Sequence, residues 1–140
     1  MSATTLPTHS VAMQRQSIPS VFLVDDSNEI RERLKELFDI GARVRIIGEA
    51  DTAACAIIKI KASQPDFVVL DYQLPDGTGL EVLRELRNQA PRTHFIVLTN
   101  HVSAELRQTL LDAGAQAFLD KSRDFGRLGG LITQLSSTTA

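Results

Sequence analysis

Short apolar runs alternate with longer polar segments between residues 21 and 119. Most runs are rich in β-branched or aromatic residues and end at a polar residue, which is typical of strands. The five runs are Val21–Val24, Val44–Ile47, Phe67–Leu70, His94–Leu98 and Ala117–Leu119. Three of them are nearly continuous rather than alternating, which favours strands that helices cover on both faces of a parallel sheet.

The segments between and after these runs carry apolar residues at the three-to-four spacing of amphipathic helices. The repeating sets are Ile30, Leu34, Leu37 and Phe38; Ala54, Ile57, Ile58 and Lys61; Leu83 and Leu86; Val102, Leu106, Leu110 and Ala113; and Phe125, Leu128, Ile132 and Leu135. Ser27 and Asp51 are the expected N-caps of the first two helices, and Thr78 with Glu81 has the form of a capping box. Pro75–Gly77 predicts a turn just before this box.

The strict alternation of strands and helices predicts parallel strands joined by right-handed crossovers. The expected fold is therefore an α/β, doubly wound, three-layer sandwich with helices on both faces of a five-stranded sheet. The last helix carries Gly126, Gly129 and Gly130, each of which costs about 1 kcal/mol relative to alanine in a helix interior. We expect this helix to be short or frayed unless packing compensates.

The domain organisation is predicted from length and composition along the chain. The 140 residues fit one domain of ordinary size. Residues 1–19 are rich in Ser, Thr, Gln and Pro without an apolar period, so we expect a flexible N-terminal tail there. The domain is expected over residues 20–136, with a C-terminal tail at 137–140. This leaves no room for a second catalytic or DNA-binding domain, so we expect output through protein–protein contacts.

Composition narrows the classes of partner. Apolar residues make up 43% of the chain, charged residues 23%, and the formal net charge is −2, values typical of globular proteins. A near-neutral chain without a Lys/Arg run argues against direct nucleic-acid binding. It has no secretory leader pattern and no 18-residue hydrophobic span, so we expect no membrane insertion and a cytoplasmic location. The single cysteine, Cys55, is expected to be a small buried hydrophobic residue.

Polar residues lie at the ends of four of the five strands. Asp25 and Asp26 come after the first strand, Asp71 after the third, Thr99 closes the fourth, and Lys121 comes after the fifth. Ligands of open α/β sheets bind beyond the carboxyl ends of the strands, so these side chains are expected to gather at one edge.

This set of residues suggests phosphoryl chemistry. Three neighbouring carboxylates repel one another, and an all-oxygen site of this kind suits Mg²⁺. Asp71 could then attack a phosphorus centre to form an acyl phosphate, while Lys121 and Thr99 spread the charge on the phosphoryl oxygens. Taken singly, Asp25 and Asp26 could merely cap a helix, and Thr99 and Lys121 could be ordinary strand and surface residues. Only their joint placement favours a site.

Four segments, in this order and at these spacings, resemble the receiver domain of bacterial response regulators. They are Phe22–Asp26, Asp66–Gly79, Ile96–Thr99 and Gly114–Lys121. The resemblance covers about residues 20–136 and implies a flavodoxin-like fold with strand order 2-1-3-4-5. It also implies a phosphoacceptor of a two-component phosphorelay, of the stand-alone type, that receives its phosphoryl group from a histidine kinase or a histidine phosphotransfer protein.

The resemblance assigns roles to individual residues. It makes Asp71 the phosphoacceptor, Asp26 a direct Mg²⁺ ligand, Asp25 a ligand acting largely through water, and the backbone carbonyl of Gln73 a further ligand. Such a receiver catalyses its own phosphotransfer and dephosphorylation without being an enzyme in the usual sense.

The remaining roles concern the response to phosphorylation. By the same resemblance, Lys121 and Thr99 contact the phosphoryl group, and Phe118 takes the place of the aromatic switch residue that moves with the threonine. Gln73 and His101, two residues beyond Asp71 and Thr99, are expected to tune the dephosphorylation rate. The partner surface is expected on the fourth helix, the fifth strand and the fifth helix.

Two positions depart from the family pattern. Ser122 comes after Lys121 where the family usually has a proline after a cis peptide bond, and a cis bond before serine would cost about 2.5 to 4 kcal/mol. The geometry of this loop therefore stays open. Asn100 stands where the family often has a small residue, which adds bulk near the phosphate without removing a donor.

Three alternatives remain from the sequence. A haloacid dehalogenase-like phosphohydrolase also uses an aspartyl nucleophile with Mg²⁺, but it normally needs a second aspartate two residues later, where this chain has Gln73. A receiver-like scaffold that is never phosphorylated is the second alternative, although nothing needed for phosphorylation is missing. A phosphate shuttle between histidine-bearing proteins is as compatible with the sequence as an output effector.

Overall fold

The computed structural model describes residues 18–41 and 43–139, so the expected tail of residues 1–19 lies almost entirely outside the described part. Five parallel strands form one sheet in the order β2-β1-β3-β6-β7. They are β1 Ser20–Val24, β2 Arg45–Ala50, β3 Phe67–Leu70, β6 His94–Thr99 and β7 Ala117–Asp120. Counted along the chain, this is the expected order 2-1-3-4-5, and the doubly wound fold is confirmed.

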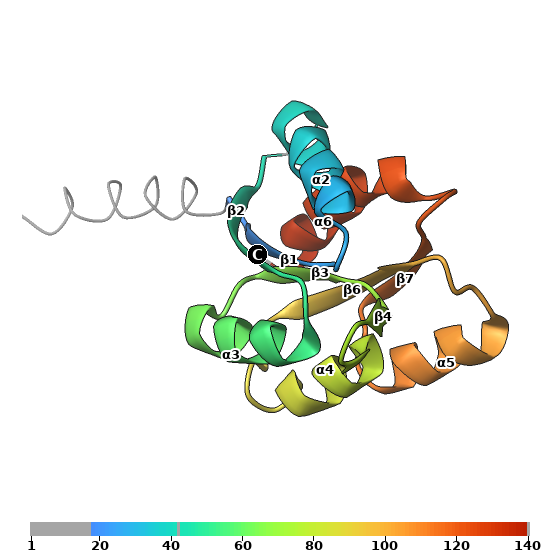
Figure 1. Ribbon diagram of the computed structural model, residues 1–140. Coiled ribbons are helices and arrows are strands. Elements are labelled where there is room, and N and C mark those ends of the chain that lie inside the picture. Colours follow the sequence, from blue (N-terminus) through green and yellow to red (C-terminus); the bar gives the residue numbers. More distant parts are fainter. Residues whose placement is uncertain (1–17, 42, 140) are drawn as a thin grey trace, which may run out of the picture.

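Helices cover both faces of the sheet, as Figure 1 shows. The helices α2 and α6 pack on one face, and α3, α4 and α5 pack on the other. Their bounds are α2 Asn28–Gly41, α3 Ala53–Ser63, α4 Gly79–Leu86, α5 Ala104–Asp112 and α6 Leu128–Thr139, with a 3₁₀ turn η1 at Phe125–Arg127. Within the described residues, none of these helices has the length and hydropathy that a membrane crossing requires.

The central strands are buried on both faces, as their continuous apolar runs predicted. In β1, Val21 and Leu23 belong to the core under α2 and α6, whereas Phe22 and Val24 belong to the core under α3, α4 and α5. Every residue of β1 and β3 is buried. The two strands therefore form a rigid support for the side chains at their carboxyl ends.

Two of the three predicted helix starts are confirmed. The Ser27 hydroxyl accepts a hydrogen bond from the Ile30 amide at 3.1 Å, and Thr78 and Glu81 form the complete capping box. The N-cap of α3 is Thr52 and not Asp51, because the Thr52 hydroxyl accepts from the backbone of α3. The prediction was wrong by one residue, since both side chains are good caps and the pattern cannot rank them.

The predicted inner face of α3 was also wrong. Its buried residues are Ala53, Ala56 and Ile60, whereas Ile58 is 69% exposed. Alanine-rich helices give a weak periodic signal, and here small residues let α3 lie close to the sheet. Cys55 is half-buried and packs against this core, so it is less enclosed than expected.

The last helix is longer than its glycines suggested. It runs from Leu128 to Thr139, three residues beyond the boundary expected at 136, and Gly126 falls in the preceding 3₁₀ turn. Leu128 and Ile132 are completely buried against the sheet. Packing therefore compensates for the low helix propensity of Gly129 and Gly130.

Candidate functional site

The sheet brings the predicted site residues to one edge. The backbone ladder continues up to them: the Asp25 amide donates to the Ala50 carbonyl at 3.1 Å, and the Asp71 amide donates to the Val24 carbonyl at 3.0 Å. On the other side, the Lys121 amide donates to the Thr99 carbonyl at 2.9 Å. Each side chain is thus positioned by a strand end rather than by a free loop, which limits its motion.

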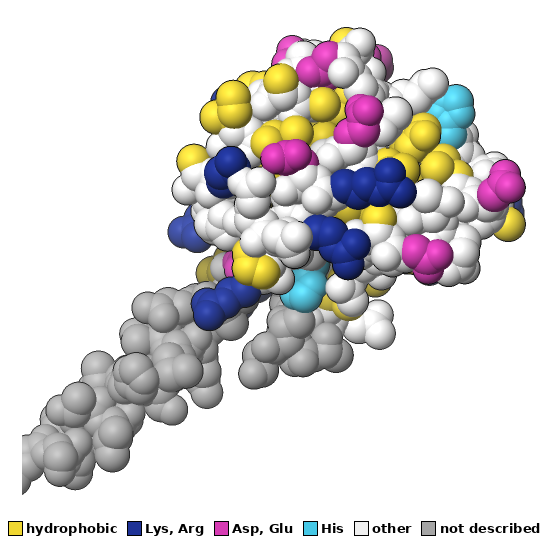
Figure 2. All heavy atoms as spheres, turned by 90° about the horizontal axis from the view of Figure 1, so that it is seen from below, with side chains coloured by type: hydrophobic (Ala, Val, Ile, Leu, Met, Phe, Trp, Pro, Cys, Tyr) yellow, Lys and Arg dark blue, Asp and Glu magenta, His cyan; other side chains and the backbone are white. Residues whose placement is uncertain are grey.

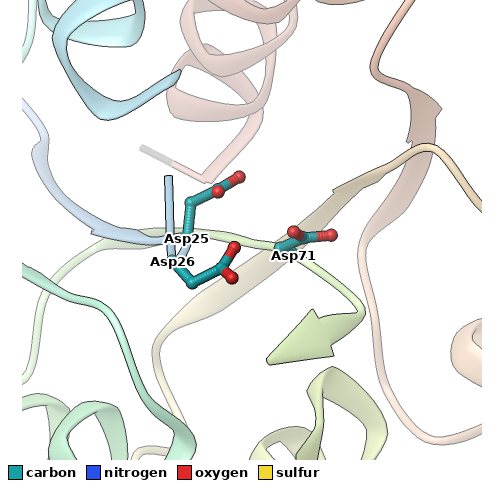
Figure 3. Close-up of side chains that lie close together, drawn as sticks. All are labelled: Asp25, Asp26 and Asp71. Atoms are coloured by element: carbon teal, nitrogen blue, oxygen red, sulfur yellow. The ribbon is translucent and has the colours of Figure 1, made fainter. Parts of the chain in front are cut away.

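Asp25, Asp26 and Asp71 form a cluster of carboxylates, shown in Figure 3. One carboxylate oxygen from each lies within 4.8 Å of the others. Asp25 and Asp71 are buried, whereas Asp26 is exposed at the mouth of the cluster. The cluster was predicted from the strand ends, and the structure brings all three residues together.

Lys121 completes this cluster as its counter-ion. Its Nζ atom lies 2.7 Å from Oδ2 of Asp25 and 3.0 Å from Oδ2 of Asp71, and only 10% of its side chain is exposed. Burial raises the pKa of Asp71 above its ordinary value, and the hydrogen bond from Lys121 opposes that shift without cancelling it. Burial alone would lower the pKa of Lys121, but its hydrogen bonds to both carboxylates raise it. Lys121 therefore stays an ammonium at neutral pH.

The donor set fits a hard divalent cation. Three carboxylates face one ammonium, so negative charge remains in excess, and every available ligand atom is an oxygen. Mg²⁺ prefers oxygen ligands and commonly uses one or two carboxylates together with waters. The exposed position of Asp26 leaves an open side through which such an ion can enter.

Thr99 and His101 lie on the β6 side of the site. Thr99 is completely buried, and its hydroxyl oxygen accepts a hydrogen bond from the His101 amide at 3.2 Å. His101 is exposed, and its ring and that of Tyr72 lie in a T-shaped arrangement, with 6.2 Å between the ring centroids. Gln73 is exposed as well and begins the two-residue strand β4 (Gln73–Leu74). Both residues named for dephosphorylation therefore lie on the solvent side of the site.

Residues 21–133 match the family model described as the response regulator receiver domain. The chain belongs to this family. Because the match spans most of the chain, the receiver interpretation is favoured over the phosphohydrolase alternative.

Curated relatives and solved structures agree with this assignment. The chain is 37% identical over 101 residues to the DNA-binding transcriptional activator DevR/DosR of Mycobacterium tuberculosis, covering 72% of this chain and 46% of that protein. It is 34% identical over 125 residues to the KDP operon transcriptional regulatory protein KdpE of Escherichia coli, covering 86% of this chain and 54% of that protein. The match thus spans about half the length of these two relatives.

Among solved structures, the signal receiver domain of a putative Luxo repressor protein from Vibrio parahaemolyticus superimposes with a TM-score of 0.79 at 30% identity, covering 86% of this chain and 92% of that one. The receiver domain of the putative response regulator NarL from Mycobacterium tuberculosis gives a TM-score of 0.79 at 27% identity, covering 86% and 97%.

In this receiver, Phe118 lies beside a cavity. The side chain is 8% exposed and packs in the core under α3, α4 and α5. The cavity, about 460 Å³, lies between the start of α5 and the loop after β7, and Val102, Arg107 and Arg123 also line it. Val102 is 55% exposed and precedes α5, so its expected place on the inner face of that helix was wrong.

The loop after Lys121 is held by side chains rather than by a proline. All peptide bonds of the described residues, including Lys121–Ser122, are trans. An Asp120 carboxylate oxygen accepts from both the amide and the hydroxyl of Ser122, at 2.9 and 2.8 Å. Asp124 in turn accepts from the Asp120 amide at 2.9 Å. These bonds fix the turn that carries Lys121 into the receiver site.

The sequence did not reveal two residues that shape the segment after Asp71. A Cβ atom on Gly79 would lie 2.6 Å from the Asp71 carbonyl oxygen, so only glycine fits there. Asp76 accepts hydrogen bonds from the Ala53 and Ala54 amides at 2.7 and 3.0 Å, which ties this segment to the start of α3 and lowers the pKa of Asp76. The segment Gln73–Thr78 is a short hairpin, β4 with β5 (Gly77–Thr78), in which the predicted turn joins the strands.

Proposed function

We propose that this receiver accepts a phosphoryl group on Asp71, with Mg²⁺, from a histidine kinase or a histidine phosphotransfer protein. The observation that carries the proposal is a buried Asp71 carboxylate with two further carboxylates within 4.8 Å and the Lys121 ammonium at 3.0 Å. A nucleophile in this position is already oriented when the donor binds. The Lys121 ammonium lies where negative charge will develop on the phosphoryl oxygens.

In the proposed reaction, an Asp71 carboxylate oxygen forms a bond to phosphorus as the bond from phosphorus to the donor's histidine nitrogen breaks. The histidine nitrogen keeps the electron pair of that bond. Lys121 then exchanges part of its contact with Asp71 for a phosphoryl oxygen, and the Thr99 hydroxyl donates to another. Bound Mg²⁺, held by the Asp25, Asp26 and Asp71 carboxylates and the Gln73 carbonyl, would supply charge compensation on the phosphoryl oxygens.

The output proposed for the phosphorylated form is altered binding of a partner protein at the surface of α5, β7 and α6. The cavity beside Phe118 opens at this surface and supports the proposal. The match covers only 46% of DevR/DosR and 54% of KdpE, so the DNA binding stated in the name of DevR/DosR is not carried over to this chain. On the face of α3, α4 and α5 seen in Figure 2, acidic and basic side chains are interspersed with uncharged ones, which suits protein contacts better than a nucleic-acid backbone.

The proposal is tested by intact-protein mass measurement after incubation with acetyl phosphate. We expect one phosphoryl group on the wild type in the presence of Mg²⁺ and none on Asp71→Asn. Asp39→Asn is the control, since Asp39 is an exposed carboxylate near the end of α2, away from the strand ends, and its replacement should leave labelling unchanged. In Asp26→Ala, adding Mg²⁺ should no longer increase the labelling. Equal labelling of Asp71→Asn and wild type would overturn the proposal, and absence of labelling in the wild type would favour the scaffold alternative.

A further inference from the structure

Arg31, on the first turn of α2, reaches back to the segment after β1. Its Nη1 donates to the backbone carbonyl of Asp25, its Nε donates to Oε1 of Glu49 at 2.7 Å, and its Nη2 donates to Oδ1 of Asn28 at 3.1 Å. The side chain is only 13% exposed. A guanidinium engaged in three directions and largely removed from water has one orientation, and it transmits that orientation to the groups it binds.

The carbonyl that Arg31 holds belongs to the peptide between Asp25 and Asp26. Asp25 is also fixed elsewhere: its Oδ1 accepts from the Ser27 amide at 2.9 Å, and its Oδ2 pairs with Lys121 at 2.7 Å. Within the described part of the chain, the exposed Asp26 carboxylate makes no hydrogen bond or ion pair. The direction of Asp26 toward Asp71 is therefore set by its backbone, and Arg31 fixes the peptide plane that precedes it.

Glu49, on β2, anchors this arginine. Its Oε1 binds Arg31, and its Oε2 lies 2.6 Å from Nζ of Lys35, which also contacts Glu32 at 3.0 Å. The Glu49 carboxylate offsets the charge of Arg31 close to the acidic cluster. Without such a partner, a free guanidinium beside the cluster would repel an incoming divalent cation.

We propose that Arg31 is a positioning residue for the cation site, holding the Asp25–Asp26 peptide so that Asp26 points at Asp71, and that Glu49 holds and neutralises Arg31 in that task. The inference rests on the proposed function, because it presumes that the three carboxylates bind Mg²⁺. It extends the site to two residues, on α2 and β2, that do not touch the ion or the phosphoryl group. Groups that orient metal ligands in this way typically change metal affinity about 10- to 100-fold when removed.

The test is a Mg²⁺ titration of the whole chain followed by tyrosine fluorescence. Tyr72 is the only tyrosine, there is no tryptophan, and Tyr72 comes directly after Asp71, so its emission reports on the site. We expect Arg31→Met to weaken Mg²⁺ binding about 10- to 100-fold. The Mg²⁺ affinity of Arg31→Lys should lie between those of the wild type and Arg31→Met, because an ammonium can bind the Asp25 carbonyl but cannot span all three acceptors.

Lys35→Met is the matched control. It removes the other cation from Glu49 but does not touch the Asp25–Asp26 peptide, so its Mg²⁺ affinity should stay within about twofold of the wild type. Far-UV circular dichroism and the thermal midpoint of each variant separate loss of fold from loss of affinity. A merely structural role would lower the midpoint of Arg31→Met while its folded form bound Mg²⁺ normally, and that result would overturn the inference.

If Arg31→Met does not fold, Arg31→Lys decides, and wild-type Mg²⁺ affinity in that variant would overturn the inference. Failure of the proposed function has a different signature. In that case the wild type itself would show no Mg²⁺ response, and Asp26→Ala would be indistinguishable from it.

Discussion

The two sides of the site are built in different ways. On the acceptor side, which comprises Asp25, Asp71 and Lys121, all three side chains are nearly buried, each backbone amide continues the sheet ladder, and the ammonium contacts both carboxylates. On the response side, which comprises residues 99–103 and the cavity beside Phe118, only Thr99 is buried and Asn100–Ser103 are all exposed.

The difference between the two sides matches two requirements of a receiver, phosphoryl transfer and a change of shape. Phosphoryl transfer needs groups that are already in place, and the acceptor side has many mutually supporting contacts. A change of shape needs an element with more than one acceptable packing, and the response side has exposed residues and a cavity of about 460 Å³. Thr99 joins the two sides, since it is fixed in β6 but its hydroxyl already binds the exposed His101.

The largest expected effect comes from the acceptor side. Lys121→Met removes the cation that contacts Asp71 and should slow phosphorylation by acetyl phosphate about 100-fold, the usual effect of losing one preorganised charge-stabilising group. The measurement is the rate of phosphoprotein formation by mass. Lys59→Met, which changes an exposed lysine that donates to the Glu49 carbonyl at 3.3 Å, should react at the wild-type rate. If Lys121→Met is phosphorylated at a rate within about threefold of the wild type, the contact between Lys121 and Asp71 does not promote phosphoryl transfer.

A smaller effect is expected where the two sides meet the solvent. Replacing both Gln73 and His101 by alanine should change the rate of phosphate loss about tenfold, which corresponds to about 1.4 kcal/mol on the barrier. The lifetime of the phosphoprotein is the measured quantity. The pair His94 and Gln116, hydrogen bonded at 3.2 Å at the opposite end of β6, offers a double alanine control with the same residue types. An unaltered lifetime in the variant lacking Gln73 and His101 would show that these two residues do not tune dephosphorylation.

The smallest effect concerns stability. Because burial raises the pKa of Asp71, the folded form keeps a proton that the unfolded form has lost as pH rises from the ordinary carboxyl value through the raised one. Stability contributed by this group therefore falls with rising pH over that window. Without Mg²⁺, Asp71→Asn should be more stable than the wild type at pH 7, because it removes a carboxylate whose burial the contact with Lys121 only partly compensates.

Urea unfolding of both proteins at several pH values measures this difference. The advantage of Asp71→Asn should shrink as pH falls through the window and vanish once Asp71 is protonated in both states. If the free energies of unfolding of the two proteins vary with pH in parallel, burial of the Asp71 charge does not destabilise the fold.

The sequence revealed the acceptor side well. Continuous apolar runs identify buried parallel strands, and one geometric rule places the residues after each strand at a common edge, so Asp25, Asp71 and Lys121 could be grouped without coordinates. The order of strands came from the family resemblance. These features depend on local pattern and on connections between neighbouring elements.

Contacts that depend on how elements pack could not be predicted. Asp76 caps a helix 23 residues earlier in the chain, and Arg31 binds Glu49 18 residues away, and neither pair has a local signal. The inner face of α3 was misjudged because Ala53, Ala54 and Ala56 satisfy several helical periods equally. The trans loop after Lys121 depends on Asp120, whose side-chain bonds to Ser122 replace the proline that is usual at this position in the family.

We expect Thr99 to transmit the state of Asp71 from the acceptor side to the response side. Amide hydrogen exchange over residues 99–132, with and without a beryllofluoride mimic on Asp71, measures this coupling. We predict that the mimic alters exchange there in the wild type and in Thr93→Ala, a threonine control directly before the first residue of β6, but not in Thr99→Ala. The coupling expected is about 1 to 3 kcal/mol, so the altered rates should differ by about 5- to 150-fold. An equal response of Thr99→Ala and wild type to the mimic would contradict the account.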